Sequence, residues 1–90
     1  MLKPITLKQF DKDFKLCIRR NYNIQKIKTA MQALINEERL ESHYRNHKLT
    51  GNYKNRWECH IEGDWLLIYR IDKSDNTIIF ERTGTHSDLF

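Results

Sequence analysis

The sequence contains little proline, glycine or cysteine, and it has no long apolar run. Its 90 residues include 1 Pro, 3 Gly and 2 Cys. Cys17 and Cys59 are not part of a CxxC pair, so we expect buried free thiols, with neither a disulfide framework nor a zinc knuckle. The longest strictly apolar run covers residues 65–69, whereas a membrane-spanning helix needs ~20 residues. The first residues also lack the apolar stretch of a signal peptide. We therefore expect a soluble, cytoplasmic protein with no membrane partner.

The length of the chain limits its architecture. A mass of 11.0 kDa leaves room for one domain over residues 1–90, because domains typically contain ~100–150 residues. Doubly wound dinucleotide-binding folds and (β/α)₈ barrels need longer chains. The hydrophobic content of 39% is well above that of disordered sequences. We expect no cofactor, since a domain of this size cannot enclose a large one.

Positive charge is concentrated in the N-terminal third of the chain. The 16 Lys and Arg against 12 Asp and Glu give a net charge of +4. Residues 1–30 contain 8 basic and 2 acidic residues (8 − 2 = +6), so residues 31–90 carry the difference, −2. This basic region can meet a polyanion or an acidic protein, or it can be a solvated face. The main candidates are Lys8, Lys12, Lys15, Arg19 and Arg20.

Hydrophobic periodicity in the first half predicts one strand and two helices. Residues 2–6 favour a short strand, and Pro4 within it suits a sheet edge. Thr6 and Asn23 are the expected N-caps of the two helices. Apolar residues recur at helical spacing in two stretches: Leu7, Phe10, Phe14, Cys17 and Ile18, then Ile24, Ile27, Met31, Leu34 and Ile35. Because about three residues join them, the helices must form a hairpin.

The second half predicts three strands, which gives an α+β fold in the order strand, helix, helix, strand, strand, strand. Residues 57–62 alternate at period two, residues 65–71 are typical of a central strand, and residues 77–82 form the last strand. Residues 37–56 have little periodicity and predict a long ordered loop with at most one helical turn. We expect the helical hairpin to pack on one face of a twisted, mainly antiparallel sheet.

Histidines supply the candidate chemistry. His60 lies on the polar face of its strand, His47 precedes that strand and His86 follows the last one, so all three can converge with Asp64 on the exposed face. Scattered surface histidines are one interpretation. A zinc site is a second, although the sequence contains no HExxH motif. A third is metal-free acid–base catalysis, because free imidazole titrates near pH 6.5 and one member of a pair can be protonated while the other is neutral.

RNA cleavage by its own 2′-OH suits such a pair. One His takes the 2′-OH proton, and another protonates the leaving 5′-oxygen. A cation such as Arg82 or Lys54 would stabilise the charge that builds on the phosphorane. Tyr53, Trp65 and Phe90 can stack on unpaired bases if they are exposed, although each can instead belong to the core.

Four runs of residues carry a family resemblance. They are HKLTG (47–51), WECHI (57–61), DWLLIY (64–69) and FERTGTHSDLF (80–90). Together with the basic amphipathic helices, they resemble the YafQ branch of the RelE/ParE toxin superfamily over essentially the whole chain. The resemblance implies helices packed against a twisted antiparallel sheet. It also implies a cytoplasmic toxin of a type II toxin–antitoxin pair, a ribosome-dependent endoribonuclease that cuts mRNA in the A site and leaves a 2′,3′-cyclic phosphate and a 5′-OH.

The resemblance also assigns roles to individual residues. The implied catalytic positions are His47, His60, Asp64 and His86. The implied acid–base pair is His60 and His86, in either order. The candidates for substrate binding are Arg82 near the scissile phosphate, the C-terminal aromatic Phe90, Trp65 and Lys54. A role for Arg56 is in doubt, because it stands one place before the position where the branch often has a basic residue. His43 has no counterpart and is expected to be a surface residue.

The implied partners are the ribosome with its mRNA and a cognate antitoxin. Basic side chains on the first helix would contact rRNA phosphates or an acidic antitoxin segment that folds on binding. The free toxin is expected to be a monomer and to form a hetero-oligomer with the antitoxin. Two alternatives stay open: a non-enzymatic gyrase inhibitor of the ParE type, and a plain RNA- or partner-binding module. The histidine cluster favours the endoribonuclease, because an inhibitor needs no acid–base pair.

Overall fold

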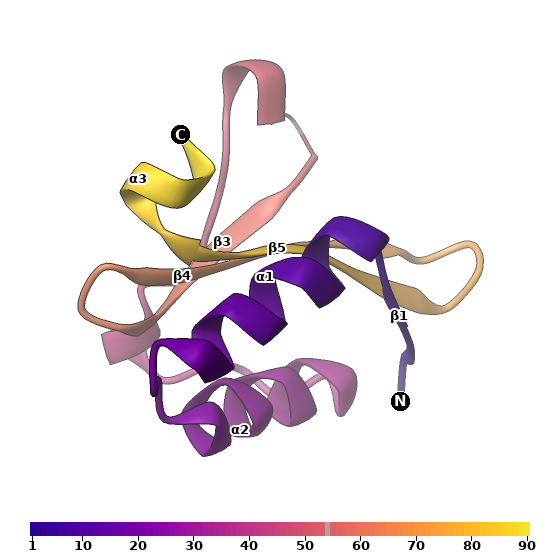
Figure 1. Ribbon diagram of the computed structural model, residues 1–90. Coiled ribbons are helices and arrows are strands. Elements are labelled where there is room, and N and C mark those ends of the chain that lie inside the picture. The colour runs from indigo at the N-terminus through magenta and orange to yellow at the C-terminus, as the bar shows by residue number, and fades with distance from the viewer. Residues whose placement is uncertain (54) are drawn as a thin grey trace.

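The computed structural model describes residues 1–53 and 55–90, which form a five-stranded sheet with helices on both faces (Figure 1). In chain order the elements are β1 (Lys3–Thr6), α1 (Lys8–Arg19), α2 (Ile24–Ile35), the 3-10 turn η1 (Ser42–Tyr44), β2 (His47–Lys48), the 3-10 turn η2 (Gly51–Tyr53), β3 (Trp57–Glu62), β4 (Trp65–Asp72), β5 (Thr77–Thr85) and α3 (His86–Leu89). The predicted α+β class and the order of its main elements are confirmed. Within the described residues, no helix is long and apolar enough to cross a bilayer.

The strands lie in the order β1-β5-β4-β3-β2. Edge strand β1 runs parallel to β5, and the other pairs are antiparallel, so the sheet is mainly antiparallel as predicted. Strand β4 is central, in agreement with its apolar residues on both faces. Pro4 lies in the edge strand, where its missing N–H removes little hydrogen bonding.

Helices α1 and α2 cover one face of the sheet and enclose the main core (Figure 1). Cys17 and Cys59 are buried free thiols there, and burial raises the pKa of the Cys59 thiol to about 12. Asn23 caps α2, since its side chain accepts a hydrogen bond from the backbone N–H of Gln25. The predicted cap Thr6 is wrong. The chain stays bonded to the sheet for one residue more, with the Leu7 N–H 3.1 Å from the Phe80 carbonyl oxygen, and α1 begins without a side-chain cap.

The opposite face carries a smaller apolar cluster beneath α3. It consists of Leu66, Ile68 and Leu89, with Leu49 packed against them. The segment that contains η2 rises from this same face in Figure 1. The sheet is therefore covered on both sides near its centre, and we call this second side the α3 face.

Two segments differ from the sequence prediction. Residues 37–56 contain strand β2 and two 3-10 turns rather than a loop with a single turn. Strand β5 continues past Arg82 to Thr85, where α3 begins with a capping box. The Asp88 N–H lies 3.3 Å from Thr85 Oγ1, and the Thr85 N–H lies 2.9 Å from Asp88 Oδ2. These bonds satisfy free N–H groups at the helix start and turn the C-terminal residues back over the sheet.

Candidate active site

The first half of the site lies where β2 pairs with β3. His47 stands opposite Glu58 in the register, and its Nε2 lies 3.0 Å from Glu58 Oε2. Its Nδ1 lies 2.6 Å from the carbonyl oxygen of Arg45, which can only accept, so Nδ1 carries a proton. The imidazole is therefore held between a carbonyl oxygen on one side and a carboxylate oxygen on the other. The His47 ring centroid is 6.4 Å from that of His60. The structure thus brings His47 and His60 together.

Glu58 is a site residue that the sequence prediction missed. The residue is only 4% exposed, and its second carboxylate oxygen, Oε1, has no hydrogen-bond partner within residues 1–53 and 55–90. A buried carboxylate with an unpaired oxygen lowers stability, and such a group in a folded protein often has a functional role. The sequence offers one indication of this role: side chains alternate between the two faces of a strand, so Glu58 and His60 lie on the same face of β3. The burial of Glu58 was not visible from that pattern.

The second half of the site lies where β5 leads into α3. The His86 backbone N–H lies 3.4 Å from Asp64 Oδ1, and the His86 Nδ1 lies 3.7 Å from the same oxygen. The Phe90 ring centroid lies 5.0 Å from that of His86 and 5.1 Å from that of Tyr53, the latter edge to face. Asp64 therefore contacts the start of α3, and the aromatic rings extend the site beside His86.

The sheet register relates the two halves. His60 is opposite Leu66 on β4, and Leu66 is opposite Gly84 on β5. Two strand spacings, about 10 Å, separate His60 from Gly84. His86 begins α3 two residues after Gly84, above the Leu66 and Leu89 cluster. The His60 and His86 positions therefore border the α3 face at the same end of the sheet.

Arg82 is held in place by Asp13 of α1. Its Nε and Nη2 lie 2.7 Å and 3.3 Å from the two carboxylate oxygens, and the Thr83 N–H also points to Oδ2, at 3.2 Å. The hydrogen bonds that Arg82 donates to the Asp13 carboxylate raise the pKa of Arg82. With 30% of its side chain exposed, Arg82 is a permanently charged group with remaining N–H donors. The other predicted cation, Lys54, lies outside the described residues.

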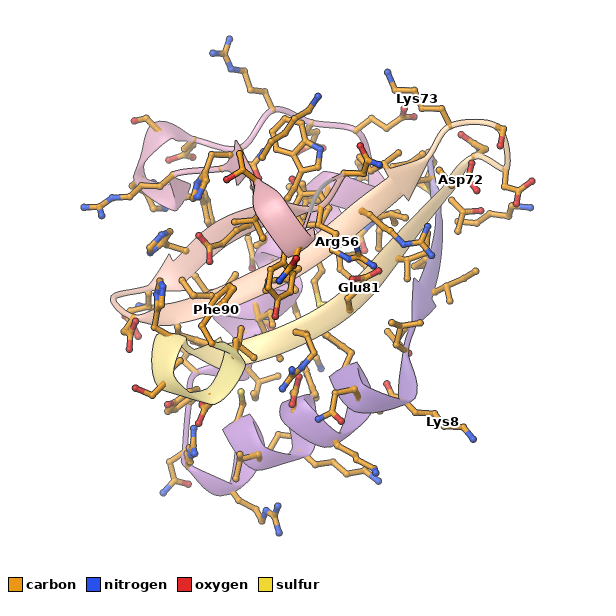
Figure 2. The ribbon with its side chains drawn as sticks, turned by 90° about the horizontal axis from the view of Figure 1, so that it is seen from above. Lys8, Arg56, Asp72, Lys73, Glu81 and Phe90 are labelled. Carbon is orange, nitrogen blue, oxygen red and sulfur yellow. The ribbon has the colours of Figure 1, made fainter. Side chains whose placement is uncertain are left out.

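Two further arginines share one carboxylate on the α3 face. Arg56 and Arg70 both form ion pairs with Glu81, a residue that is 7% exposed. Figure 2 looks onto this face and shows Arg56 beside Glu81, with Phe90 nearby. Because Glu81 binds both guanidinium groups, Arg56 contributes to the framework around the site.

The prediction that Trp65 contacts substrate is wrong. Trp65 is 5% exposed and belongs to the main core. Its indole N–H donates to Thr83 Oγ1 at 2.9 Å, and its ring lies 4.9 Å from that of Tyr22. The physical reason is the position of β4 in the middle of the sheet, where the Trp65 side chain points toward the helices. It cannot stack on an RNA base.

The basic residues of the first helix divide into two groups. The side chains of Lys8, Lys12, Lys15 and Arg19 are exposed on α1, and Figure 2 shows Lys8 pointing away from the fold. Arg20 instead binds Asp88 of α3 with two hydrogen bonds, of 2.6 Å and 3.2 Å. This contact raises the pKa of Arg20 and holds the pKa of Asp88 well below its usual range. The ion pair with Arg20 therefore holds α3, the helix that begins at His86, against the end of α1.

The titratable side chains of the site lie in pairs. Within the part of the chain that the structure describes, no three or more His, Cys, Asp or Glu side chains are arranged to hold a metal ion. The carboxylates of the site are paired with individual imidazoles, as in His47–Glu58 and His86–Asp64.

Comparison with known proteins places the chain in a family. Residues 2–90 match the model of the bacterial toxin of type II toxin–antitoxin systems, YafQ. The chain belongs to the YafQ family. This toxin is 42% identical, over 83 residues, to the mRNA interferase toxin YafQ of Escherichia coli strain K12, a match that covers 91% of this chain and 88% of the relative. The predicted resemblance is thereby confirmed.

Solved structures of bacterial toxins share the fold. The metal-bound toxin from Helicobacter pylori superimposes with a TM-score of 0.94 at 38% identity, and the match covers 100% of both chains. A chain of the Escherichia coli DinJ–YafQ complex superimposes with a TM-score of 0.91 at 38% identity, covering 100% of this toxin and 99% of that chain. The arrangement of helices and sheet described above is therefore that of the family.

Proposed function

We propose that this YafQ-family toxin is an mRNA interferase, an endoribonuclease that cleaves mRNA on the ribosome and so inhibits translation. The observation that carries the proposal is a group of three imidazoles at one end of the α3 face, two of which, His47 and His86, have a carboxylate partner. His47 and His60 lie together beside Glu58, and His86 lies beside Asp64. Its E. coli relative is named an mRNA interferase toxin, which supports the same activity.

The reaction that suits this arrangement is cleavage by the neighbouring 2′-hydroxyl. One imidazole of the His60 and His86 pair removes the 2′-OH proton, and the 2′-oxygen attacks the adjacent phosphorus. The bond to the 5′-oxygen breaks, and the other imidazole protonates that oxygen. The products are a 2′,3′-cyclic phosphate and a 5′-OH. No water or metal is consumed, so atoms and charge balance within the substrate and the two imidazoles.

The surrounding residues support these steps. The contact between His47 and Glu58 holds the His47 ring next to His60. Asp64 orients His86 through its backbone and ring. Arg82, fixed by Asp13, stabilises the negative charge that develops on the phosphorane.

The aromatic residues give the site a surface for unpaired bases. The Phe90 ring lies between those of Tyr53 and His86 and is 54% exposed as a residue. Base stacking on such rings is the usual way in which proteins hold single-stranded RNA. Phe90 would thereby position a nucleotide next to the scissile phosphate.

The proposed partners follow from charge and from the relatives. Exposed Lys8, Lys12, Lys15 and Arg19 would contact rRNA phosphates or acidic antitoxin residues. The E. coli relative has been crystallised as a DinJ–YafQ toxin–antitoxin complex, so we assign this toxin a cognate antitoxin with which it forms a hetero-oligomer. The free toxin would act as a monomer in the cytoplasm, where the ribosomes are.

Primer extension on an mRNA translated in the presence of the purified toxin tests the proposal. We expect cleavage with wild-type toxin, also in EDTA, and none with His86→Ala. Lys73→Ala is the control for handling and folding, because Lys73 lies in the turn between β4 and β5, at the far end of the hairpin from α3 (Figure 2). Cleavage by His86→Ala at the wild-type rate would contradict the proposal. Intact mRNA together with blocked gyrase would favour the alternative inhibitor.

A further inference from the structure

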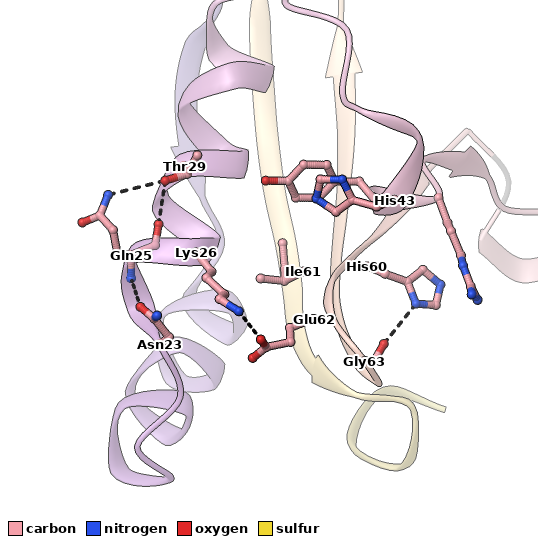
Figure 3. Close-up of a pocket in the computed structure, with 11 residues that line it drawn as sticks. Asn23, Gln25, Lys26, Thr29, His43, His60, Ile61, Glu62 and Gly63 are labelled. Carbon is pink, nitrogen blue, oxygen red and sulfur yellow. Dashed lines mark hydrogen bonds and ion pairs between the residues drawn. The ribbon is translucent and has the colours of Figure 1, made fainter.

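A cavity of about 710 Å³ opens beside His60 and is not used by the reaction described above (Figure 3). Its walls are the first turns of α2, the turn η1 and the end of β3. The volume falls in the range of ~300–1,000 Å³ that is typical of small-ligand sites. His60 lines its rim, so the cavity directly adjoins the proposed site of cleavage.

One wall of the cavity offers aromatic rings. His43 and Tyr44, both from η1, have ring centroids 4.2 Å apart with planes inclined by 33°. Tyr44 is partly buried against the main core, which fixes its ring, whereas 62% of the His43 side chain is exposed. A rigid ring with an exposed second ring beside it is a suitable surface for stacking a nucleobase.

The opposite wall offers hydrogen-bonding groups on α2. Thr29 Oγ1 donates to the Gln25 carbonyl oxygen at 2.8 Å, and the ion pair between Lys26 and Glu62 crosses the cavity floor next to Ile61 (Figure 3). Lys26 neutralises the Glu62 carboxylate. The floor therefore presents polar groups without excess negative charge, which suits the edge of a base.

Arg45 is a second cation that lines the cavity, beside Lys26. It is exposed, lines the cavity and forms no hydrogen bond or ion pair through its guanidinium with the described residues. Its backbone has a φ of 48°, a left-handed conformation that is unusual for a residue with a side chain. Its carbonyl oxygen accepts the hydrogen bond from His47 Nδ1. One residue thus joins the cavity to the proposed catalytic imidazoles.

We propose that this cavity is a nucleotide subsite for single-stranded mRNA next to the scissile phosphate. In it the base stacks on the exposed face of the His43 ring, which Tyr44 supports from behind, its edge faces the polar groups of α2, and Arg45 contacts the neighbouring phosphate. The subsite rests on the proposed nuclease function, and it assigns to η1 part of the sequence preference of cleavage. His43, which has no role in the reaction itself, becomes a binding residue.

The test compares His43→Ala and Arg45→Ala with wild-type toxin on ribosomes programmed with a short mRNA. Both variants should raise KM by about 5- to 100-fold, the range for loss of one stacked base or one charged contact, with kcat within about twofold. Their pattern of cut sites should also change. Arg39→Ala is the matched control, since Arg39 is an exposed arginine outside the cavity. It should leave KM and the cut sites unchanged.

Wild-type KM and cut sites in both variants would overturn the subsite. Loss of antitoxin binding with unchanged mRNA cleavage would also overturn it and would assign the cavity to the antitoxin. His86→Ala in the same assay separates this result from the function as a whole. If that variant is inactive while the cavity variants behave as wild type, the subsite alone is wrong.

Discussion

The two faces of the sheet are built for different purposes. The face under α1 and α2 is filled by a large apolar core, which includes the indole of Trp65. Among residues 1–53 and 55–90, the apolar cluster of the α3 face has three buried members, surrounded by charged and imidazole groups. Stability therefore resides mainly on the helical-hairpin side, whereas chemistry resides on the other. This division predicts that substitutions on the two faces affect different measurements.

The largest effect on activity is expected for the two imidazoles that border the α3 face. His60→Ala and His86→Ala should each lower mRNA cleavage by about 10²–10⁴-fold, because a general acid or base contributes that much. His86 is exposed and His60 is partly exposed, so the thermal midpoint should hardly change. Single-turnover cleavage and calorimetry on the same samples measure both quantities. If either variant unfolds as well as losing activity, the conclusion that the α3 face contributes little to stability is wrong.

A large effect on stability is expected for Trp65, which lies on the face of the sheet under α1 and α2. Trp65→Ala should lower the free energy of unfolding by about 3–5 kcal/mol, because it removes a buried aromatic ring and leaves a cavity. Chemical denaturation measures this loss. Phe90→Ala is the comparison on the α3 face: it should leave stability within about 1 kcal/mol and raise KM. Equal destabilisation by both substitutions would show that the faces do not differ.

A sharper comparison concerns Glu58, the buried residue of the α3 face. Glu58→Gln keeps the shape of the side chain but removes the carboxylate that pairs with His47 and has an unpaired oxygen. We expect cleavage to fall by at least about tenfold while the stability changes by less than about 1 kcal/mol, because the amide keeps a polar contact with His47 and the cost of burying the carboxylate is removed. Urea unfolding measures the stability of the variant, and the rate of mRNA cleavage measures its activity. A large loss of stability would identify Glu58 as a structural residue.

The smallest effect on stability is expected for the ion pair between Arg20, at the end of α1, and Asp88 of α3. Asp88 has a lowered pKa because Arg20 binds its carboxylate, so this pair stabilises the fold above about pH 4 and loses that contribution as the pH falls further. Asp88→Asn should therefore reduce the dependence of stability on pH below about pH 4. Thermal unfolding between acidic and neutral pH measures it, with Arg19→Ala as a control on the same helix. An unchanged pH dependence in Asp88→Asn would contradict the role of the pair.

The parts of the fold that the sequence predicted are those with local periodicity. Helical spacing predicted α1 and α2, and period two predicted β3, because one face of each element is buried in a continuous core. Residues 37–56 have no such period. Their 3-10 turns and β2 depend on contacts with β3, for example between His47 and Glu58, which local patterns do not report.

The sequence predicts which polar residues belong to the candidate site, but it does not predict which neighbouring side chains are buried. The placement of His47, His60, Asp64 and His86 along the chain predicts that they converge, the family resemblance adds their catalytic roles, and the register brings their elements to one end of the sheet. The burial of Glu58 was missed, because it depends on the chain segments that cover the α3 face. Trp65 was misjudged for the reverse reason: both faces of a central strand are covered, so its alternation does not show which side chain reaches solvent.

The central claim is that two imidazoles on one face exchange protons with the substrate. The most direct measurement uses an mRNA in which sulfur replaces the bridging 5′-oxygen at the cleavage site, because a thiolate leaves without needing an acid. We predict that this substrate restores cleavage to one of the variants His60→Ala and His86→Ala and not to the other, thereby identifying the acid and the base. Failure to restore cleavage in either variant, or wild-type rates for both on the ordinary mRNA, would contradict the account.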